Sequence, residues 1–285
     1  MTRIKQFFYL TKPGIIMGNA ITATAGFMLA SQGKASVGLY LAMLAGLSLI
    51  IASACVFNNY IDRGIDKKMT RTKNRALVSG MISGAHAIIY GTFLGLSGLL
   101  ILLRYTNALT AGVAVFGFFS YVVLYGIWKR RSAYGTLVGS VSGAVPPVVG
   151  YSAVSNRLDM GALLLFIILV LWQMPHFYAI AIYRVKDYKS ALVPVLPAKK
   201  GIARTKLSMV FYVAAFTLAA SILSVFGFTG IAYLVVVGLL GVSWLRMGMR
   251  GFNTNNDEAW ARGMFRFSLI VITGFSAMIV IDSLF

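Results

Sequence analysis

The sequence predicts an all-α integral membrane protein, built as one bundle of about nine transmembrane helices. Hydrophobic residues make up 59% of the 285 residues and charged residues only 12%, whereas soluble domains carry about 25% charged residues. Apolar runs of about 18 residues or more, the length needed to cross a bilayer, recur along the whole chain. We therefore expect a helical bundle with almost no soluble part.

The apolar runs place nine spans along the chain, which we treat as a single domain over residues 1–285. The spans cover approximately residues 14–31, 37–57, 82–103, 108–128, 135–153, 161–183, 207–227, 230–247 and 264–283. If the N-terminus is cytoplasmic, 23 of the 26 Lys and Arg residues fall in cytoplasmic segments. Because these residues accumulate in cytoplasmic loops, the sequence predicts a cytoplasmic N-terminus and a periplasmic C-terminus. The tract 251–263 is interpreted as a solvated cytoplasmic loop.

The same asymmetry accounts for the formal net charge of +19. A basic chain can bind nucleic acid, but no basic helix with interleaved aromatic residues lies outside the predicted spans. We therefore expect no nucleic-acid partner. The single cysteine, Cys55, lies inside an apolar run, and one cysteine excludes an internal disulfide.

A polar segment after the second span contains the main candidate site. Asp62 and Asp66 lie four positions apart, and Asn58 precedes them by another four. On a helix this spacing puts three oxygen-bearing side chains on one face, and Mg²⁺ prefers oxygen ligands. The cations around the carboxylates are Arg63, Lys67, Lys68, Arg71, Lys73 and Arg75. The pattern indicates a metal-bridged anionic ligand, in particular a diphosphate, at the cytoplasmic end of this span.

The fifth span contains glycines four residues apart and the pair Pro146-Pro147. Small residues let helices approach closely, and two prolines remove two backbone donors, which kinks or breaks a helix. We interpret the span mainly as packing geometry. The alternative is that the break makes room for a large ligand.

The sixth span ends with the pair Pro175-His176. Polar side chains inside a membrane are costly and are often functional. His176 either hydrogen-bonds a neighbouring carbonyl, orients or ligates a metal-containing substrate, or transfers a proton. His86, at the start of the third span, is interpreted as structural.

The cytoplasmic segments 58–80 and 184–206 follow spans two and six. This spacing of four spans suggests an internal repeat of a four-helix unit, and such repeats often place a site between the two halves. Asp187 lies in the second segment. It is either neutralised by Lys186 or supplies a further metal ligand to the first acidic segment.

A diphosphate attached to a lipid-like chain fits both the polar segment and the apolar spans. If the chain is allylic, Mg²⁺ at the acidic site would neutralise the departing diphosphate and leave an allylic carbocation. The acids expected to be catalytic are Asp62, Asp66 and Asp187. The cations expected to stabilise the leaving group are Arg71, Arg75, Lys129 and Arg130. The aromatic side chains expected to stabilise the carbocation are Tyr121, Tyr125 and Tyr183.

Several motifs resemble one family. The run from Asn58 to Arg75 is similar to the first acidic motif of the intramembrane aromatic prenyltransferase superfamily, and within it to the protohaem IX farnesyltransferases, or haem O synthases. Other stretches that resemble the same family are Thr11-Lys12-Pro13-Gly14, residues 143–150, Trp172-Gln173-Met174-Pro175-His176 and Lys186-Asp187-Tyr188. The resemblance covers nearly the whole chain. The wider superfamily usually has two or more acids in its second motif, whereas this chain offers Asp187 alone.

The resemblance implies a nine-helix bundle in the bacterial cytoplasmic membrane, with an active site on the cytoplasmic side. It implies transfer of farnesyl from farnesyl diphosphate to a vinyl group of haem b, with Mg²⁺ as cofactor. The Mg²⁺ ligands that it implies are Asn58, Asp62, Asp66 and Asp187. Lys186 becomes a further diphosphate partner and His176 a haem-binding residue. Membrane lipid surrounds the chain, and a haem-copper oxidase assembly or a haem A synthase-like protein is a possible partner.

Three other functions fit parts of the pattern. A transporter of haem or organic anions would have broken helices and membrane histidines, but its charged site would lie near mid-membrane. A related prenyltransferase with a quinone precursor as acceptor would share the first acidic motif. A membrane phosphoalcohol transferase also uses clustered Asp residues, but its Asp-Gly…Ala-Arg pattern is absent from the sequence.

Overall fold

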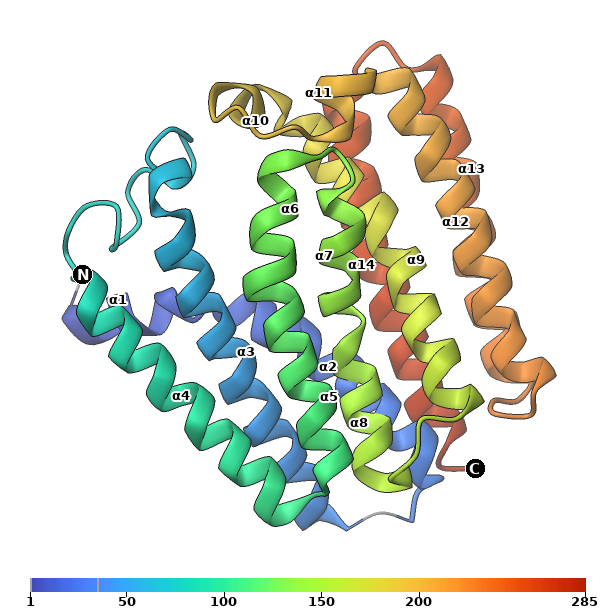
Figure 1. The fold of residues 1–285 in the computed structure, drawn as a ribbon. Helices are drawn as coiled ribbons and strands as arrows, with labels where there is room; N and C mark the ends of the chain where they lie inside the picture. The colour runs from blue at the N-terminus through green and yellow to red at the C-terminus, as the bar shows by residue number, and fades with distance from the viewer. Residues whose placement is uncertain (1, 35) are drawn as a thin grey trace.

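The computed structural model describes residues 2–34 and 36–285, which form helices joined by short loops (Figure 1). The elements before the chain midpoint are α1 (Arg3–Leu10), α2 (Pro13–Ser31), α3 (Val37–Asp66), α4 (Gly84–Tyr105), α5 (Ala108–Phe119), the π-helix η1 (Ser120–Tyr125), α6 (Gly126–Arg131) and α7 (Gly135–Gly143). Those that follow are α8 (Val145–Ser155), α9 (Met160–Tyr183), α10 (Val185–Ser190), α11 (Leu196–Lys200), α12 (Ile202–Val225), α13 (Ile231–Arg250), the 3-10 helix η2 (Gly251–Asn253) and α14 (Asp257–Asp282).

The predicted all-α membrane bundle is confirmed. Within the described ranges, nine helical segments are long and apolar enough to cross a membrane, and each overlaps one predicted span. The fourth segment joins α5, η1 and α6, and the fifth joins α7 and α8. Many large apolar side chains remain exposed on the outer surface, as expected for helices that face lipid rather than water.

The interpretation of 251–263 as a loop is wrong for its second half. After η2 only three residues remain outside a helix, and α14 begins at Asp257. The Asn256 side chain accepts a hydrogen bond from the Ala259 amide, and acids at the next two positions favour the positive end of the helix. A polar first turn therefore extends an apolar helix beyond the part that hydropathy detects.

The fifth span breaks at the predicted place. α7 ends at Gly143 and α8 begins at Val145, so Pro146 and Pro147 lie in the first turn of α8, where missing backbone donors are tolerated. The break brings α8 directly against α2. A Cβ at Gly26 would overlap the Pro147 carbonyl oxygen, and one at Gly150 would overlap the Ala23 carbonyl oxygen. The packing interpretation of this span is thus confirmed.

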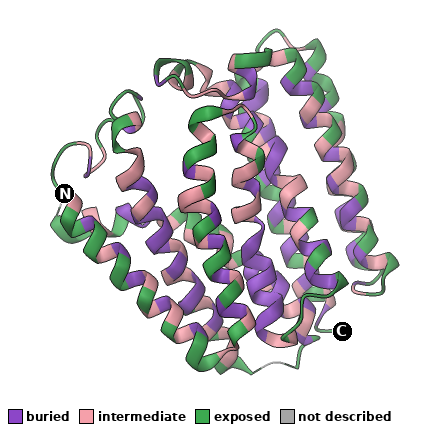
Figure 2. Ribbon diagram, in the orientation of Figure 1, coloured by how far each residue is buried: buried purple, intermediate pink, exposed green. Residues whose placement is uncertain are grey.

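The bundle places α8, α9, α2 and α14 in its middle, with the α3–α4 pair at one edge and the α12–α13 pair at the other (Figure 1). Figure 2 shows α8 buried along most of its length, in agreement with its continuous buried run from Val145 to Ala153. The largest apolar core lies between α9, α12, α13 and α14. This core includes Phe216, Trp244 and Phe275, whose rings pack edge-on or tilted at about 6 Å.

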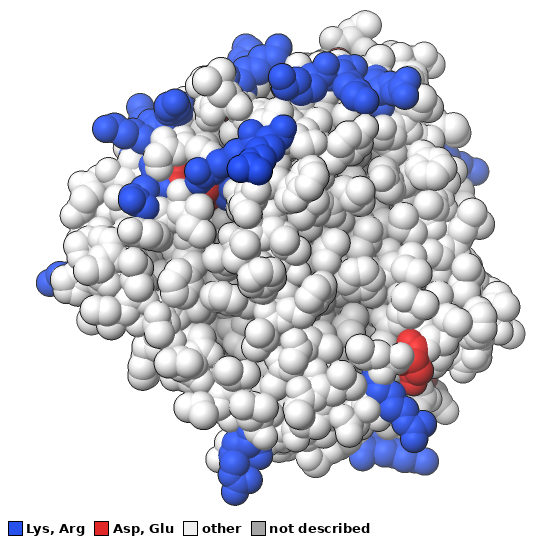
Figure 3. All heavy atoms as spheres, in the orientation of Figure 1, with Lys and Arg blue, Asp and Glu red and all other residues white. Residues whose placement is uncertain are grey.

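Lys and Arg gather at one end of the bundle, around the ends of α3 and α6 and over α10 and α11 (Figure 3). A wide band of the visible face below them carries neither sign of charge, and a few charged residues lie at the opposite end. This distribution follows the segments assigned to the cytoplasm from the sequence. The orientation of the termini and the internal four-helix repeat stay predictions.

Candidate active site

The predicted acidic motif lies on the last turns of α3, which continues nine residues beyond the predicted end of its span, to Asp66. Asn58, Asp62 and Asp66 therefore do occupy positions i, i+4 and i+8 of one helix, which share a face. Asn58 and Asp66 are buried, and the Asp62 side chain is only 14% exposed. Polar oxygens shielded to this degree need partners, because unpaired buried charge is costly.

The partners of Asp62 lie on α6, which is the last part of the fourth span. Lys129 Nζ lies 2.5 Å from Asp62 Oδ2 and Arg130 lies 3.4 Å from Asp62 Oδ1. Arg130 also donates to the Ile61 carbonyl at 2.8 Å. Two cations predicted as diphosphate partners are thus brought to the predicted acidic motif.

Asp66 finds its partner on the loop that follows α3. Arg75 Nη1 lies 2.6 Å from Asp66 Oδ2 and also donates to Asn59 Oδ1 at 3.1 Å. Thr72 Oγ1 donates to the Asp66 carbonyl, which folds the loop back over the end of the helix. The loop is therefore tied to the acidic face at more than one point.

Lys12 is a member of this site that the sequence argument did not assign to it. It adopts a left-handed conformation (φ 55°) between α1 and α2, and its Nζ donates to Asn58 Oδ1 at 3.1 Å. Within residues 2–34 and 36–285 its ammonium forms no ion pair. Burial lowers the pKa of Lys12, Cys55 raises it and Arg75 lowers it further, while Asp62 opposes the decrease. Asn58 Nδ2 is buried and has no hydrogen-bond partner in the part of the chain that the structure describes.

Tyr121 and Tyr125 both lie on η1, beside the Lys129–Asp62 ion pair. They are four positions apart, a spacing that puts side chains on a similar side of a helix, and the two rings stack with centroids 5.6 Å apart. Lys129 Nζ lies 5.0 Å from the centre of the Tyr125 ring. These two tyrosines, which were predicted as carbocation partners, therefore adjoin the Asp62 ion pair.

Tyr183 belongs to a different aromatic group, formed by α9 and α14. Its ring meets Phe265 edge-on at 6.0 Å. Phe265 lies 4.9 Å from the His176 ring, and His176 stacks on Trp172 at 4.8 Å. No aromatic contact among the described residues joins this group to Tyr121 or Tyr125.

His176 contacts a serine rather than a backbone carbonyl. Its Nδ1 lies 2.7 Å from the hydroxyl of Ser268, and that hydroxyl lies 2.6 Å from the Phe265 carbonyl. A hydroxyl has one proton to donate, and the carbonyl can only accept. His176 Nδ1 therefore carries a proton and donates to Ser268, which leaves Nε2 with a free lone pair. His86, in contrast, hydrogen-bonds Ser83 at the start of α4.

Asp187 lies on α10, apart from the two acids of α3. Its carboxylate forms no hydrogen bond or ion pair within the described part of the chain, and those residues contain no group of three or more acidic, His or Cys side chains close enough to hold a metal. α10 itself contacts the loop that follows α3, since Ser190 Oγ donates to the Lys68 carbonyl at 3.3 Å. Burial raises the pKa of Tyr188 on α10, and the charge of Arg71 opposes this increase. Lys186 is exposed.

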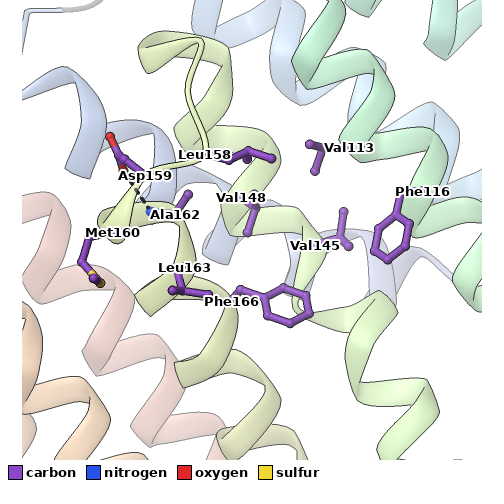
Figure 4. Close-up of a pocket in the computed structure, with 10 residues that line it drawn as sticks. All are labelled: Val113, Phe116, Val145, Val148, Leu158, Asp159, Met160, Ala162, Leu163 and Phe166. Atoms are coloured by element: carbon purple, nitrogen blue, oxygen red, sulfur yellow. Dashed lines mark hydrogen bonds between the residues drawn. The ribbon is translucent and has the colours of Figure 1, made fainter.

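The groove drawn in Figure 4 lies at the opposite end of the bundle, between α5, α8 and α9. Its volume is about 500 Å³ and nearly all of its lining side chains are apolar. Its one acid, Asp159, caps α9 by accepting from the Gly161 and Ala162 amides. The groove thus offers an anionic head group no cation among its lining residues.

Comparison with known proteins identifies the family. Residues 19–270 match the UbiA prenyltransferase family. A protein from Protochlamydia amoebophila named protoheme IX farnesyltransferase is 53% identical over 98% of this chain and 99% of its own, and one of the same name from Serratia proteamaculans is 52% identical over 98% and 95%.

Solved structures agree on the fold. A structure of digeranylgeranylglyceryl phosphate synthase superposes with a TM-score of 0.82 at 18% identity, covering 100% of this chain and 99% of that one. A UbiA homologue from Archaeoglobus fulgidus, bound to GPP and Mg²⁺, gives 0.69 at 14% identity over 96% and 99%. The resemblance found from the motifs is confirmed: this chain belongs to the UbiA prenyltransferase family.

Proposed function

We propose that the protein transfers the farnesyl group of farnesyl diphosphate to a vinyl group of haem b, which yields haem O and diphosphate. The observation that carries the proposal is the shielded set of charges at the end of α3, where Asp62 and Asp66 meet Lys129, Arg130 and Arg75. The name of the relatives at 52–53% identity supports farnesyl as donor and protohaem as acceptor.

The residues at the end of α3 fit a Mg²⁺ ion. Asn58, Asp62 and Asp66 offer oxygen ligands on one helix face. Asn58 Nδ2, a buried donor without a partner among the described residues, would suit a diphosphate oxygen beside the ion. Mg²⁺ bound there would neutralise charge on the diphosphate. Asp187 is proposed as an additional ligand, because α10 is hydrogen-bonded to the loop after α3.

The cations of the site would hold the leaving diphosphate. Lys129 and Arg75 now pair with the carboxylates, and we expect them to turn to the diphosphate when it binds. Lys12, Arg71, Arg130 and Lys186 are proposed as further partners. Preorganised cations of this kind favour charge that develops as a bond breaks.

The prenyl and haem groups would meet between the two aromatic groups. The C–O bond of farnesyl diphosphate breaks with the electron pair leaving on diphosphate, and the rings of Tyr121 and Tyr125 stabilise the allylic cation. The terminal vinyl carbon of haem b then bonds to the farnesyl carbon. Water adds to the resulting haem-side cation and loses a proton. Tyr183 was predicted to share the carbocation role, but we now propose that it contacts the haem side instead.

His176 is proposed to bind the haem. Its Nε2 has a free lone pair because Ser268 fixes the proton on Nδ1, and a neutral imidazole nitrogen is a common iron ligand. We place this chemistry at the cytoplasmic face of a bacterial inner membrane, with the N-terminus inside. A haem-copper oxidase assembly or a haem A synthase-like protein would take up the product.

The test is incubation of the purified protein with haem b, farnesyl diphosphate and Mg²⁺, followed by mass analysis of the haem. We expect a haem that has gained a hydroxyl and a farnesyl group, with release of diphosphate. An unmodified haem together with a prenylated phenolic acid would replace haem by a quinone precursor as acceptor. Absence of diphosphate release with every acceptor would favour a transporter.

A further inference from the structure

Two arginines from different helices converge on Tyr183 at the cation-rich end of the bundle. Arg184 follows Tyr183 at the end of α9, and Arg262 comes from the second turn of α14. Their guanidinium carbons lie 5.5 and 5.0 Å from the centre of the Tyr183 ring. The ring thus holds two guanidinium groups within one small area, although neither residue was assigned to a site from the sequence.

The charge in this area is poorly neutralised. Within the described ranges Arg184 forms no ion pair, and Arg262 pairs only with Glu258, whose side chain is 58% exposed. Arg262 is the main cause that lowers the pKa of Glu258, and Lys186 contributes to the same decrease. Lys186 has no ion-pair partner among the described residues. The two guanidinium groups together have one solvent-exposed carboxylate partner, that of Glu258 on Arg262, so this area can bind further carboxylates.

The two arginines lie next to Tyr183, which is the end member of the aromatic group that contains His176. From Tyr183 the contacts run through Phe265 to His176 and then to Trp172, along α9 and α14. A flat apolar ligand lying along these rings with its polar edge at the arginines would match both ends of the group. Haem b has this form, since its carboxylates lie on one edge of the macrocycle and its vinyl groups on the opposite half.

We propose that Arg184 and Arg262 bind the two propionate carboxylates of the haem acceptor and so set its orientation. The inference rests on the proposed function for the identity of the acceptor. Guanidinium groups suit this task because they bind carboxylates through paired hydrogen bonds. With the propionates held at the surface, the vinyl groups point away from it and into the bundle, where the reaction requires them.

The test compares protohaem with its propionate dimethyl ester, which keeps both vinyl groups but has no carboxylate. Haem binding is measured by the change in Soret absorbance in protein loaded with a non-ionisable farnesyl diphosphate analogue. For protohaem we expect Arg184→Gln and Arg262→Gln each to raise Kd about tenfold, the loss of one charge-assisted pair. For the diester we expect no change in Kd, because it makes no bond to either arginine.

Matched variants separate this role from a structural one. Arg250→Gln removes an exposed arginine at the same end of the molecule, outside this group, and should leave Kd for protohaem unchanged. Arg262→Lys should recover part of the affinity. Glu258→Gln removes the present ion-pair partner of Arg262. It should lower the Kd for protohaem about twofold and leave the Kd for the diester unchanged.

Equal losses for protohaem and the diester in both arginine variants would overturn the inference, as would unchanged Kd for protohaem in both. These outcomes differ from failure of the proposed function. If wild-type protein binds neither porphyrin, haem is not the acceptor. If it binds both with equal Kd and, given farnesyl diphosphate in place of the analogue, prenylates both, haem is the acceptor but the propionates are not recognised.

Discussion

The ion pair between Asp62 and Lys129 joins two largely shielded side chains, which are 14% and 11% exposed. Removal of the carboxylate leaves a shielded ammonium without compensation, which is destabilising, and removes an expected Mg²⁺ ligand. We therefore expect Asp62→Asn to lower the Tm of the ligand-free protein and to reduce diphosphate release at least about 100-fold. The control is Asp282→Asn, which changes the last residue of α14, outside the acidic site. We expect this variant to keep near-normal turnover. Near-normal turnover of Asp62→Asn would refute its role at the metal.

Lys12 offers a test of the cation set that does not involve the carboxylates. Among residues 2–34 and 36–285, its ammonium has one hydrogen-bond partner, the amide oxygen Asn58 Oδ1, so we expect it to be able to bind diphosphate oxygens. Lys12→Met should raise the KM for farnesyl diphosphate about tenfold. Lys12→Arg, which keeps the charge, should raise this KM less than Lys12→Met does. The KM for haem should not change. An exposed neighbour on α1, Lys5, provides the control as Lys5→Met; equal KM values in the Lys12→Met variant and the wild type would contradict the assignment.

Local spacing explains which site residues could be predicted. The pattern of Asn58, Asp62 and Asp66 is contained in two helical turns, so the sequence alone predicts their common face. The contact between Lys12 and Asn58 spans 46 positions and depends on a left-handed residue. The neighbours of Tyr183 could not be predicted either. Its place at the end of a span predicts its depth in the membrane, but not its contacts with Phe265 and two arginines.

Helix ends were harder to predict than helix centres. Hydropathy detects the apolar part that crosses the membrane, so the predicted second span stopped at residue 57, whereas α3 continues to Asp66. The same applies to α14, whose first turn is polar and capped by Asn256. In both places the helix leaves the apolar layer while its backbone hydrogen bonding continues. The acidic motif lies on such an extension, where the cations of α6 and of the loop after α3 pair with the carboxylates and the helix still fixes their spacing.

The crossing of α2 and α8 is the element contact most sensitive to a single methyl group. A Cβ at Gly26 would overlap the Pro147 carbonyl oxygen, which belongs to backbone and cannot rotate away. We expect Gly26→Ala to destabilise the protein by about 1–3 kcal/mol, seen as a lower Tm in detergent. Gly18→Ala on the same helix meets nothing within 4 Å and should not lower Tm. Equal Tm values for the two variants would show that the helices can separate at no cost.

The whole molecule separates charge from apolar surface along its length. Cations gather over the ends of α3 and α6 and over α10, and the middle of the visible face carries no charge (Figure 3). Both proposed substrates have the same division, with anionic groups at one edge and an apolar body. Each can therefore keep its charged groups at one face of the membrane while its reactive carbon lies among the helices. α7 contacts both α6, which carries the Lys129 of the Asp62 site, and α9, which ends at Tyr183.

This division also predicts the orientation of the chain. With the N-terminus inside, 23 of the 26 Lys and Arg residues face the cytoplasm, and an odd number of spans, nine within the described residues, puts the two termini on opposite sides. We expect alkaline phosphatase, which is active only in the periplasm, to be active when fused after Phe285 and inactive when fused after Lys200. A green fluorescent protein that folds only in the cytoplasm should give the reverse pattern. Activity of the phosphatase at Lys200 would place the cation-rich end outside, away from a cytoplasmic supply of farnesyl diphosphate, and would overturn both the topology and the proposed side of the reaction.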